Sequence, residues 1–168
     1  MTRRLLTIKW TFYGLWTLLF LLVQQLVLPY IRIGGVHPFL LPMLAAVAAS
    51  FEGKWEGPIF GLMLGFVCDG LFTGAFPCFY AVVLTLAAML AGVAARHLIM
   101  PGLVCSLAVS AAALVLMGLI NTMVFSYSYG TPLTAALWLL ARELLVSLPF
   151  AILVHLAFAR IHRRFSGR

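Results

Sequence analysis

Charged side chains are scarce in this sequence. Only 9% of its 168 residues are Asp, Glu, Lys or Arg, and only four of them are acids. Because about a quarter of the residues in a soluble domain are charged, this composition excludes an ordinary water-soluble globule. The sequence also lacks a long polar stretch, since the longest loop that we expect is 29–36. No extramembrane domain of any size is therefore expected.

The residues that catalysis and metal binding require are few and scattered. Cys68, Cys78 and Cys105 lie in apolar runs without the paired spacing of a zinc site, so we expect them to be small buried side chains. The sequence contains no nucleophile elbow, no phosphate-binding glycine loop and no His-Glu metal pair on one helix. We therefore expect a protein that is not an enzyme and that holds neither a metal nor another cofactor.

What the sequence has in abundance is apolar residues, which make up 64% of the chain. A helix needs about 20 residues to cross a hydrocarbon core about 30 Å thick. This criterion predicts an all-α integral membrane protein, with one transmembrane domain over residues 1–168 that forms a compact bundle of about six helices. The expected spans are 10–28, 36–51, 57–76, 77–95, 102–125 and 131–159.

Three of these runs have a length or composition that affects how they are expected to cross the membrane. The first is too long for the core of a secretory signal and lacks a small-residue cleavage site, so we expect it to be retained as a span. The second is short and contains Pro38 and Pro42, which favours a broken or re-entrant segment. The last is too long for one straight crossing, and we expect an interfacial turn or two over 133–138 before a span from about 140 to 160.

The basic residues predict the orientation. They flank apolar runs rather than line one face, so the formal net charge of +7 does not indicate nucleic-acid binding. With six crossings and a cytoplasmic N-terminus, most of the Lys and Arg residues fall on the cytoplasmic side, as the positive-inside rule requires. These residues are Arg3, Arg4, Lys9, Lys54, Arg96, Arg160, Arg163, Arg164 and Arg168. We therefore expect both termini in the cytoplasm.

Glycines recur at four-residue spacing before and within the third run. Gly53, Gly57, Gly61 and Gly65 form a series that leads to Asp69. Four residues turn a helix by about 400°, so these glycines share one slowly drifting face. In a membrane such a face lets a second helix approach closely. The pattern is typical either of packing within the chain or of docking by a helix of another protein.

A few polar residues are expected inside the membrane. The carboxylate of Asp69 is costly in lipid and needs a partner, and Arg142 falls at a similar depth in the outer half of the bilayer. Asn121 and Glu143 are expected to join them in one intramembrane polar cluster. The cluster would either stabilise the packing of the helices or form the floor of a small-ligand pocket. His155 lies in the inner half of the last run, and we expect it to be hydrogen-bonded to a neighbour.

Residues 56–74 and 79–81, followed by an apolar helix that ends at 95–96, resemble the rod shape-determining protein MreD family. The shared pattern is a glycine-spaced helix that reaches an Asp, a short turn with glycine, and a second helix that ends in a basic residue. The length, the span count and the short loops are also similar. This sequence departs from the pattern at Gly70, where the family usually has Leu or Phe.

The resemblance implies a non-enzymatic scaffold in the inner (cytoplasmic) membrane of a rod-shaped bacterium. Such a scaffold would bind the membrane-anchored protein MreC. Through MreC it would connect MreB filaments with the glycosyltransferase RodA and its transpeptidase partner, which build peptidoglycan. MreD is also similar to the substrate-binding subunits of energy-coupling-factor vitamin transporters, so a small-molecule binding subunit is the alternative. The short expected outer loops, 72–77 and 126–132, favour the scaffold.

Overall fold

The computed structural model describes residues 3–31, 35–52, 55–72, 74, 76–97, 102–130 and 132–166. In these residues the chain folds into six α-helices and one short 3-10 helix, without strands, so the all-helical prediction is confirmed. The helices are α1 (Arg3–Leu26), η1 (Leu28–Tyr30), α2 (Leu41–Glu52), α3 (Glu56–Leu71), α4 (Phe79–His97), α5 (Leu103–Tyr129) and α6 (Leu133–Ser166).

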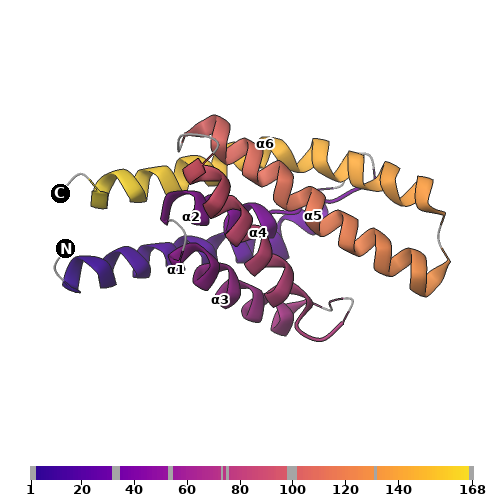
Figure 1. Ribbon diagram of the computed structural model, residues 1–168, viewed down its shortest axis with the longest axis horizontal. Coiled ribbons are helices and arrows are strands. Elements are labelled where there is room, and N and C mark those ends of the chain that lie inside the picture. Colours follow the sequence, from indigo (N-terminus) through magenta and orange to yellow (C-terminus); the bar gives the residue numbers. More distant parts are fainter. Residues whose placement is uncertain are drawn as a thin grey trace.

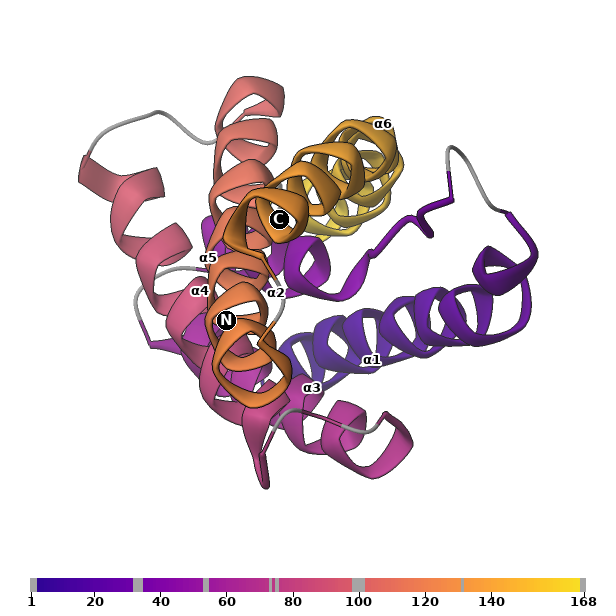
Figure 2. The ribbon, with the colours of Figure 1, turned by 90° about the vertical axis from the view of Figure 1, so that its right-hand side faces the viewer.

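The short helix α2 is the centre of the bundle. It packs against α3, α4, α5 and α6, and Figure 2 shows it surrounded by the other helices. Every residue from Leu41 to Ser50 is buried, because this segment is apolar and small residues predominate in its middle. A helix that is apolar on all sides is suited to such an enclosed position. The core of the protein is therefore built around α2.

Contacts between side chains show that the helices alternate in direction. Gln24 of α1 contacts Leu40, whereas Tyr13, which lies earlier in α1, contacts Glu52 at the end of α2. The same antiparallel relation holds between α2 and α3, α3 and α4, and α5 and α6. The start of α1 and the end of α6 consequently lie at the same end of the bundle (Figure 1). We call this the terminal end and the opposite one the distal end.

The chain enters α2 through an extended segment, Val36 to Leu40. Gln24 holds this segment from α1, because its side-chain amide donates to the Pro38 carbonyl at 3.3 Å and accepts from the Leu40 amide at 3.0 Å. Ser147 of α6 accepts from the Phe39 amide at 2.9 Å. Non-helical backbone inside a membrane protein needs such partners, since no water is available to it. The structure agrees with the expected broken second segment.

Four helices are long and apolar enough to cross a membrane, namely α1, α4, α5 and α6. In contrast, α2 has 12 residues and α3 has 16, which correspond to about 18 Å and about 24 Å. Each is shorter than the hydrocarbon core, so neither spans it as a helix alone. The chain is therefore a helical membrane protein in which two of the six helices are short.

Several expected boundaries are corrected. The helix α6 is continuous from Leu133 to Ser166, so 133–138 and the last span belong to one helix. The run expected at 77–95 begins as a helix only at Phe79, because the chain turns at Cys78, which has a positive φ of 61°. As a result Cys78 is exposed, whereas Cys68 and Cys105 are buried as predicted.

Candidate functional site

The glycine stripe of α3 packs against helices of the same chain. A methyl group added to Gly57 would lie 2.6 Å from the Ala49 Cβ of α2, and one on Gly61 would lie 2.7 Å from the Leu84 carbonyl oxygen of α4. On Gly65 it would lie 2.4 Å from the Ala81 Cα. Non-bonded carbon atoms prefer separations of about 3.5–4.0 Å. These glycines are therefore what lets α3 approach α2 and α4 so closely.

This packing corrects one interpretation of the stripe. Because α2 and α4 occupy the face that carries Gly57, Gly61 and Gly65, a helix of another protein has no room on it. Gly53, the first member of the series, lies outside the described residues. Gly57, Gly61 and Gly65 thus pack α3 against α2 and α4 within the chain.

Asp69 caps the next helix. Its Oδ1 accepts from the Tyr80 amide at 2.9 Å and its Oδ2 from the Ala81 amide at 3.0 Å, in the first turn of α4. The residue that precedes this turn is Cys78, whose sulfur is a weak acceptor. A carboxylate from α3 therefore supplies the cap, and the positive end of the α4 dipole stabilises its charge. The predicted pairing with Arg142 is replaced by two backbone amides.

We expect Asp69→Ala to lower the free energy of unfolding by about 1–2 kcal/mol, the usual cost of a lost helix cap. Asp69→Asn should cost less, because its amide oxygen can still accept one of the two hydrogen bonds. Thermal unfolding of the purified variants measures both effects. A swap of charges, Asp69→Arg with Arg142→Asp, should not restore stability. Recovery in the double variant would contradict the capping role.

The other residues of the expected polar cluster do not all meet. Asn121 of α5 and Glu143 of α6 line the same cavity, whereas Arg142 is exposed and its guanidinium lies 5.3 Å from the ring centre of Trp138. The reason is the helix arrangement, since α6 packs against α1, α2 and α5, and α3 packs against α2 and α4. The expected cluster of four residues is therefore corrected. Asn121 and Glu143 line one cavity, Asp69 contacts the backbone of α4, and Arg142 contacts Trp138.

The cavity between α5 and α6 has a volume of about 580 Å³. Its walls are mainly apolar, and its polar groups come from Asn121, Thr122 and Glu143. The remaining lining residues are Gly118, Pro132, Ala135, Ala136, Leu139 and Leu140. Its lining residues come from the second half of α5, the start of α6 and the connection between them, and this end of the α5–α6 hairpin reaches past the other helices at the distal end (Figure 1). We call it the distal cavity.

A second polar site lies near the terminal end, around Glu52. The Glu52 side chain is only 2% exposed, and it forms an ion pair with Lys9. The Tyr13 hydroxyl donates to Glu52 Oε1 at 2.6 Å, and His162 Nδ1 lies 3.7 Å from the same oxygen. Glu56 is near enough to interact electrostatically with Glu52 and Lys9. We call Lys9, Tyr13, Glu52 and His162 the Glu52 cluster.

The Glu52 cluster joins α1, α2 and α6. Glu52 is the last residue of α2, where the negative end of the helix dipole disfavours a carboxylate. Lys9 compensates for this charge, which explains why a buried acid is tolerated there. Sequence reasoning missed the cluster because it counted Lys9 only as a flanking charge. A signal was present, since Lys9 and Tyr13 are four residues apart and share one helix face.

His155 behaves as expected. It is buried, and its Nδ1 lies 2.7 Å from the Ser106 hydroxyl of α5, so the predicted hydrogen bond to a neighbour is confirmed. The ring of Phe51 lies between two histidines of α6, with centroid distances of 5.5 Å to His155 and 5.3 Å to His162. This aromatic stack anchors the end of α2 against α6.

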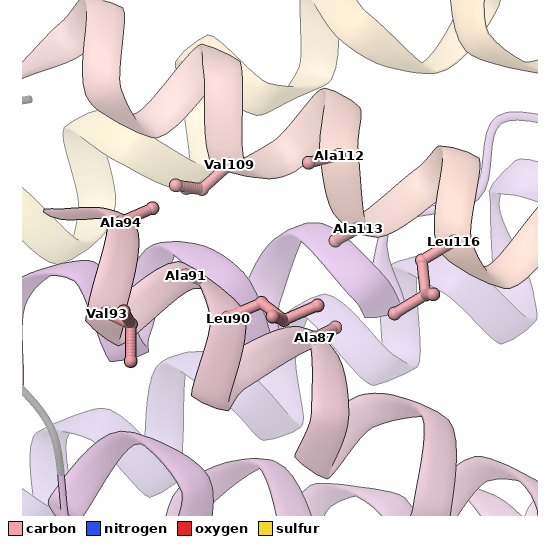
Figure 3. A pocket seen from close by; sticks show the side chains of 9 residues that line it. All are labelled: Ala87, Leu90, Ala91, Val93, Ala94, Val109, Ala112, Ala113 and Leu116. Carbon is pink, nitrogen blue, oxygen red and sulfur yellow. The ribbon is translucent and has the colours of Figure 1, made fainter. Parts of the chain in front are cut away.

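Two further hollows are apolar. One of about 270 Å³ lies between α4 and α5 and is lined mainly by alanines, which Figure 3 shows facing each other across the two helices. The other, of about 420 Å³, lies between α1 and α3 beside Gly14 and Met63. Neither contains a charged side chain among its lining residues.

Comparison of the chain with protein-family models, with curated proteins and with solved structures finds no match. Function is therefore inferred from the residues themselves. Within the described residues, no three His, Cys, Asp or Glu side chains meet in a group that could hold a metal ion. Besides the Gln24 and Ser147 contacts with 38–40, the polar sites described above are the Asp69 cap, the Glu52 cluster, the His155 hydrogen bond and the distal cavity.

Proposed function

We propose that this chain is a membrane scaffold of the bacterial cell-elongation complex, with the role that MreD has. It would lie in the inner membrane, cross it six times with both ends in the cytoplasm, and carry out no catalysis. Its direct partner would be an MreC-type protein, and through that partner it would help to position peptidoglycan synthesis by RodA and its transpeptidase.

The observation that carries the proposal is the coincidence of the MreD-like residues with one structural unit. The described residues of 56–74, together with 79–81, form the joint between α3 and α4, where the glycines allow close approach and Asp69 caps the second helix. Two features of the resemblance, the spaced glycines and the Asp, thus have a physical use in the same place. A chance match of spaced glycines would not be expected to supply the cap as well.

The topology also supports the proposed orientation. The helices alternate in direction, and the first and last of them place Lys9 and the Arg160 to Arg164 region at the same end of the bundle. Basic residues collect on the cytoplasmic side of a membrane protein. The terminal end, which also carries the Glu52 cluster, is therefore proposed to face the cytoplasm.

A second candidate function is the binding of a small molecule on behalf of a transporter. The distal cavity favours it, because its volume is that of a small-molecule site and it lies at the end where such subunits bind their ligand. Against it, only Asn121 and Glu143 of the four expected residues line the cavity. We therefore rank this function second.

Co-purification tests the proposal. The tagged chain is solubilised from the native membranes, and we expect an MreC-type protein to be recovered with it but not with an unrelated tagged membrane protein. Depletion of the chain should convert rod-shaped cells to round ones, and re-expression should reverse this. Recovery of transporter ATPase subunits, with unchanged cell shape after depletion, would favour the second function instead.

A further inference from the structure

The distal cavity combines apolar walls with one acidic side chain. Leu139 and Leu140 contribute apolar surface, while Ala135, Ala136 and Gly118 leave the space open because their side chains are small or absent. Thr122 is buried and Asn121 half-buried at the same wall. A site of this kind suits a ligand with an apolar body and one polar group.

Glu143 differs from the other acids of the chain. Glu52 is paired with Lys9, and Asp69 accepts two backbone amides. In the part of the chain that the structure describes, the half-buried carboxylate of Glu143 has neither a hydrogen bond nor an ion pair. Its neighbour Arg142 is rotated by about 100° around the helix and lies over Trp138.

The position of Glu143 along α6 is that of a membrane interface. Seventeen residues separate it from Arg160, which corresponds to about 26 Å of helix. A hydrocarbon core of about 30 Å therefore places Arg160 near one interface and Glu143 near the other. Trp138, which is exposed, precedes Glu143 by five residues, or about 8 Å of helix, as an aromatic residue of an interfacial belt does.

The negative charge of Glu143 indicates that the ligand of this cavity carries a positive charge. A carboxylate that is partly withdrawn from water is stabilised by a cation and repels an anion. The hydroxyl of Thr122 and the side-chain amide of Asn121 add hydrogen-bonding groups to the lining of the same cavity. A primary ammonium group can donate three hydrogen bonds, which matches a wall with several oxygen acceptors.

We propose that the distal cavity binds an amphiphile through its primary ammonium group, which pairs with Glu143 beside Asn121 and Thr122 while its apolar part lies against Leu139 and Leu140. The ammonium group comes either from the headgroup of an aminophospholipid or from a free amphiphilic amine. This site is independent of the scaffold function, since it requires no protein partner.

Native mass spectrometry of the purified full chain tests the site. The protein is supplied with palmitoyl-oleoyl phosphatidylethanolamine or with phosphatidylglycerol that has the same acyl chains. We expect the ethanolamine lipid to be retained preferentially, and Glu143→Gln to weaken its binding by about tenfold or more, the effect of losing one charge-assisted hydrogen bond. Arg142→Gln is the matched control, because it changes a charge one residue away but outside the cavity, and it should leave binding unchanged.

A second arm uses dodecylamine as the free amine. Glu143-dependent binding of dodecylamine without preference for the ethanolamine lipid assigns the site to a free amine and supports the proposal. Ala136→Phe fills the cavity but retains the acid, and it should abolish binding even if Glu143→Gln does not fold. Equal retention of both lipids, together with dodecylamine binding that neither variant changes, would overturn the proposal.

Discussion

A single methyl group at Gly65 is expected to separate α3 from α4. In Gly65→Ala the new carbon would lie 2.4 Å from the Ala81 Cα, and this contact is with backbone, which cannot rotate away as a side chain can. Overpacking in a rigid core costs about 1–3 kcal/mol or more, and here it would also strain the Asp69 cap one turn along. We expect a loss of about 3 kcal/mol for Gly65→Ala and no folded protein for Gly65→Leu.

Gly70 provides a matched control on the same helix. A methyl group there would meet nothing within 4 Å, so Gly70→Ala should be neutral or slightly stabilising because alanine favours the helix. Size-exclusion chromatography after stepwise heating in detergent measures both variants. Equal stability of the two would show that α3 and α4 are not packed through Gly65. Glycine-to-leucine variants on this face are consequently unsuitable for mapping a partner, since they unfold the chain.

Replacing Glu52 by glutamine is expected to be at least as damaging as Gly65→Ala. It leaves the ammonium group of Lys9, which is 11% exposed, beside a neutral amide in the interior. Breaking a buried ion pair by removing one partner costs about 3–5 kcal/mol. We therefore expect Glu52→Gln to lower the unfolding temperature strongly and to loosen α1 from α2.

The double variant Lys9→Met with Glu52→Gln tests whether stability is lost because a charge is left unpaired or because side-chain packing is changed. Because it removes both charges and retains the side-chain volumes, it should recover most of the lost stability. Glu143→Gln serves as a control, since within the described residues that carboxylate has neither a hydrogen bond nor an ion pair and its loss should leave the fold intact. A double variant that is no more stable than Glu52→Gln alone would show that the ion pair does not hold α1.

Much of the fold follows from local sequence properties. The long apolar runs predicted α1, α4, α5 and α6, because burial in lipid requires only length and hydropathy. Pro38 and the shortness of its run predicted the irregular entry to α2, since proline cannot continue a helix on its N-terminal side. The enclosure of α2 by four other helices was not predictable, because an apolar helix in lipid can face either lipid or protein.

The candidate sites were less predictable than the fold. The spacing of Gly57, Gly61 and Gly65 indicated a contact face but did not specify what covers it. Asp69 was expected to need a partner, and one exists, but backbone amides of α4 carry no sequence signature that would have identified it. The cavity at Glu143 is formed by residues of α5 and α6 that only tertiary packing brings together, which no local pattern records.

The sequence by itself determined that the chain lies in lipid rather than in water, how many apolar segments it has and on which helix face the glycines lie. These features follow from hydropathy and helical periodicity, which are local properties. Only the tertiary structure decided which helices meet. It placed α2 at the centre of the bundle and paired the Asp69 carboxylate with backbone amides of α4 rather than with Arg142. It also placed Lys9 in an ion pair with Glu52. Such pairings depend on the shapes of all six helices at once, since each buried polar group must find a partner among those that packing brings near.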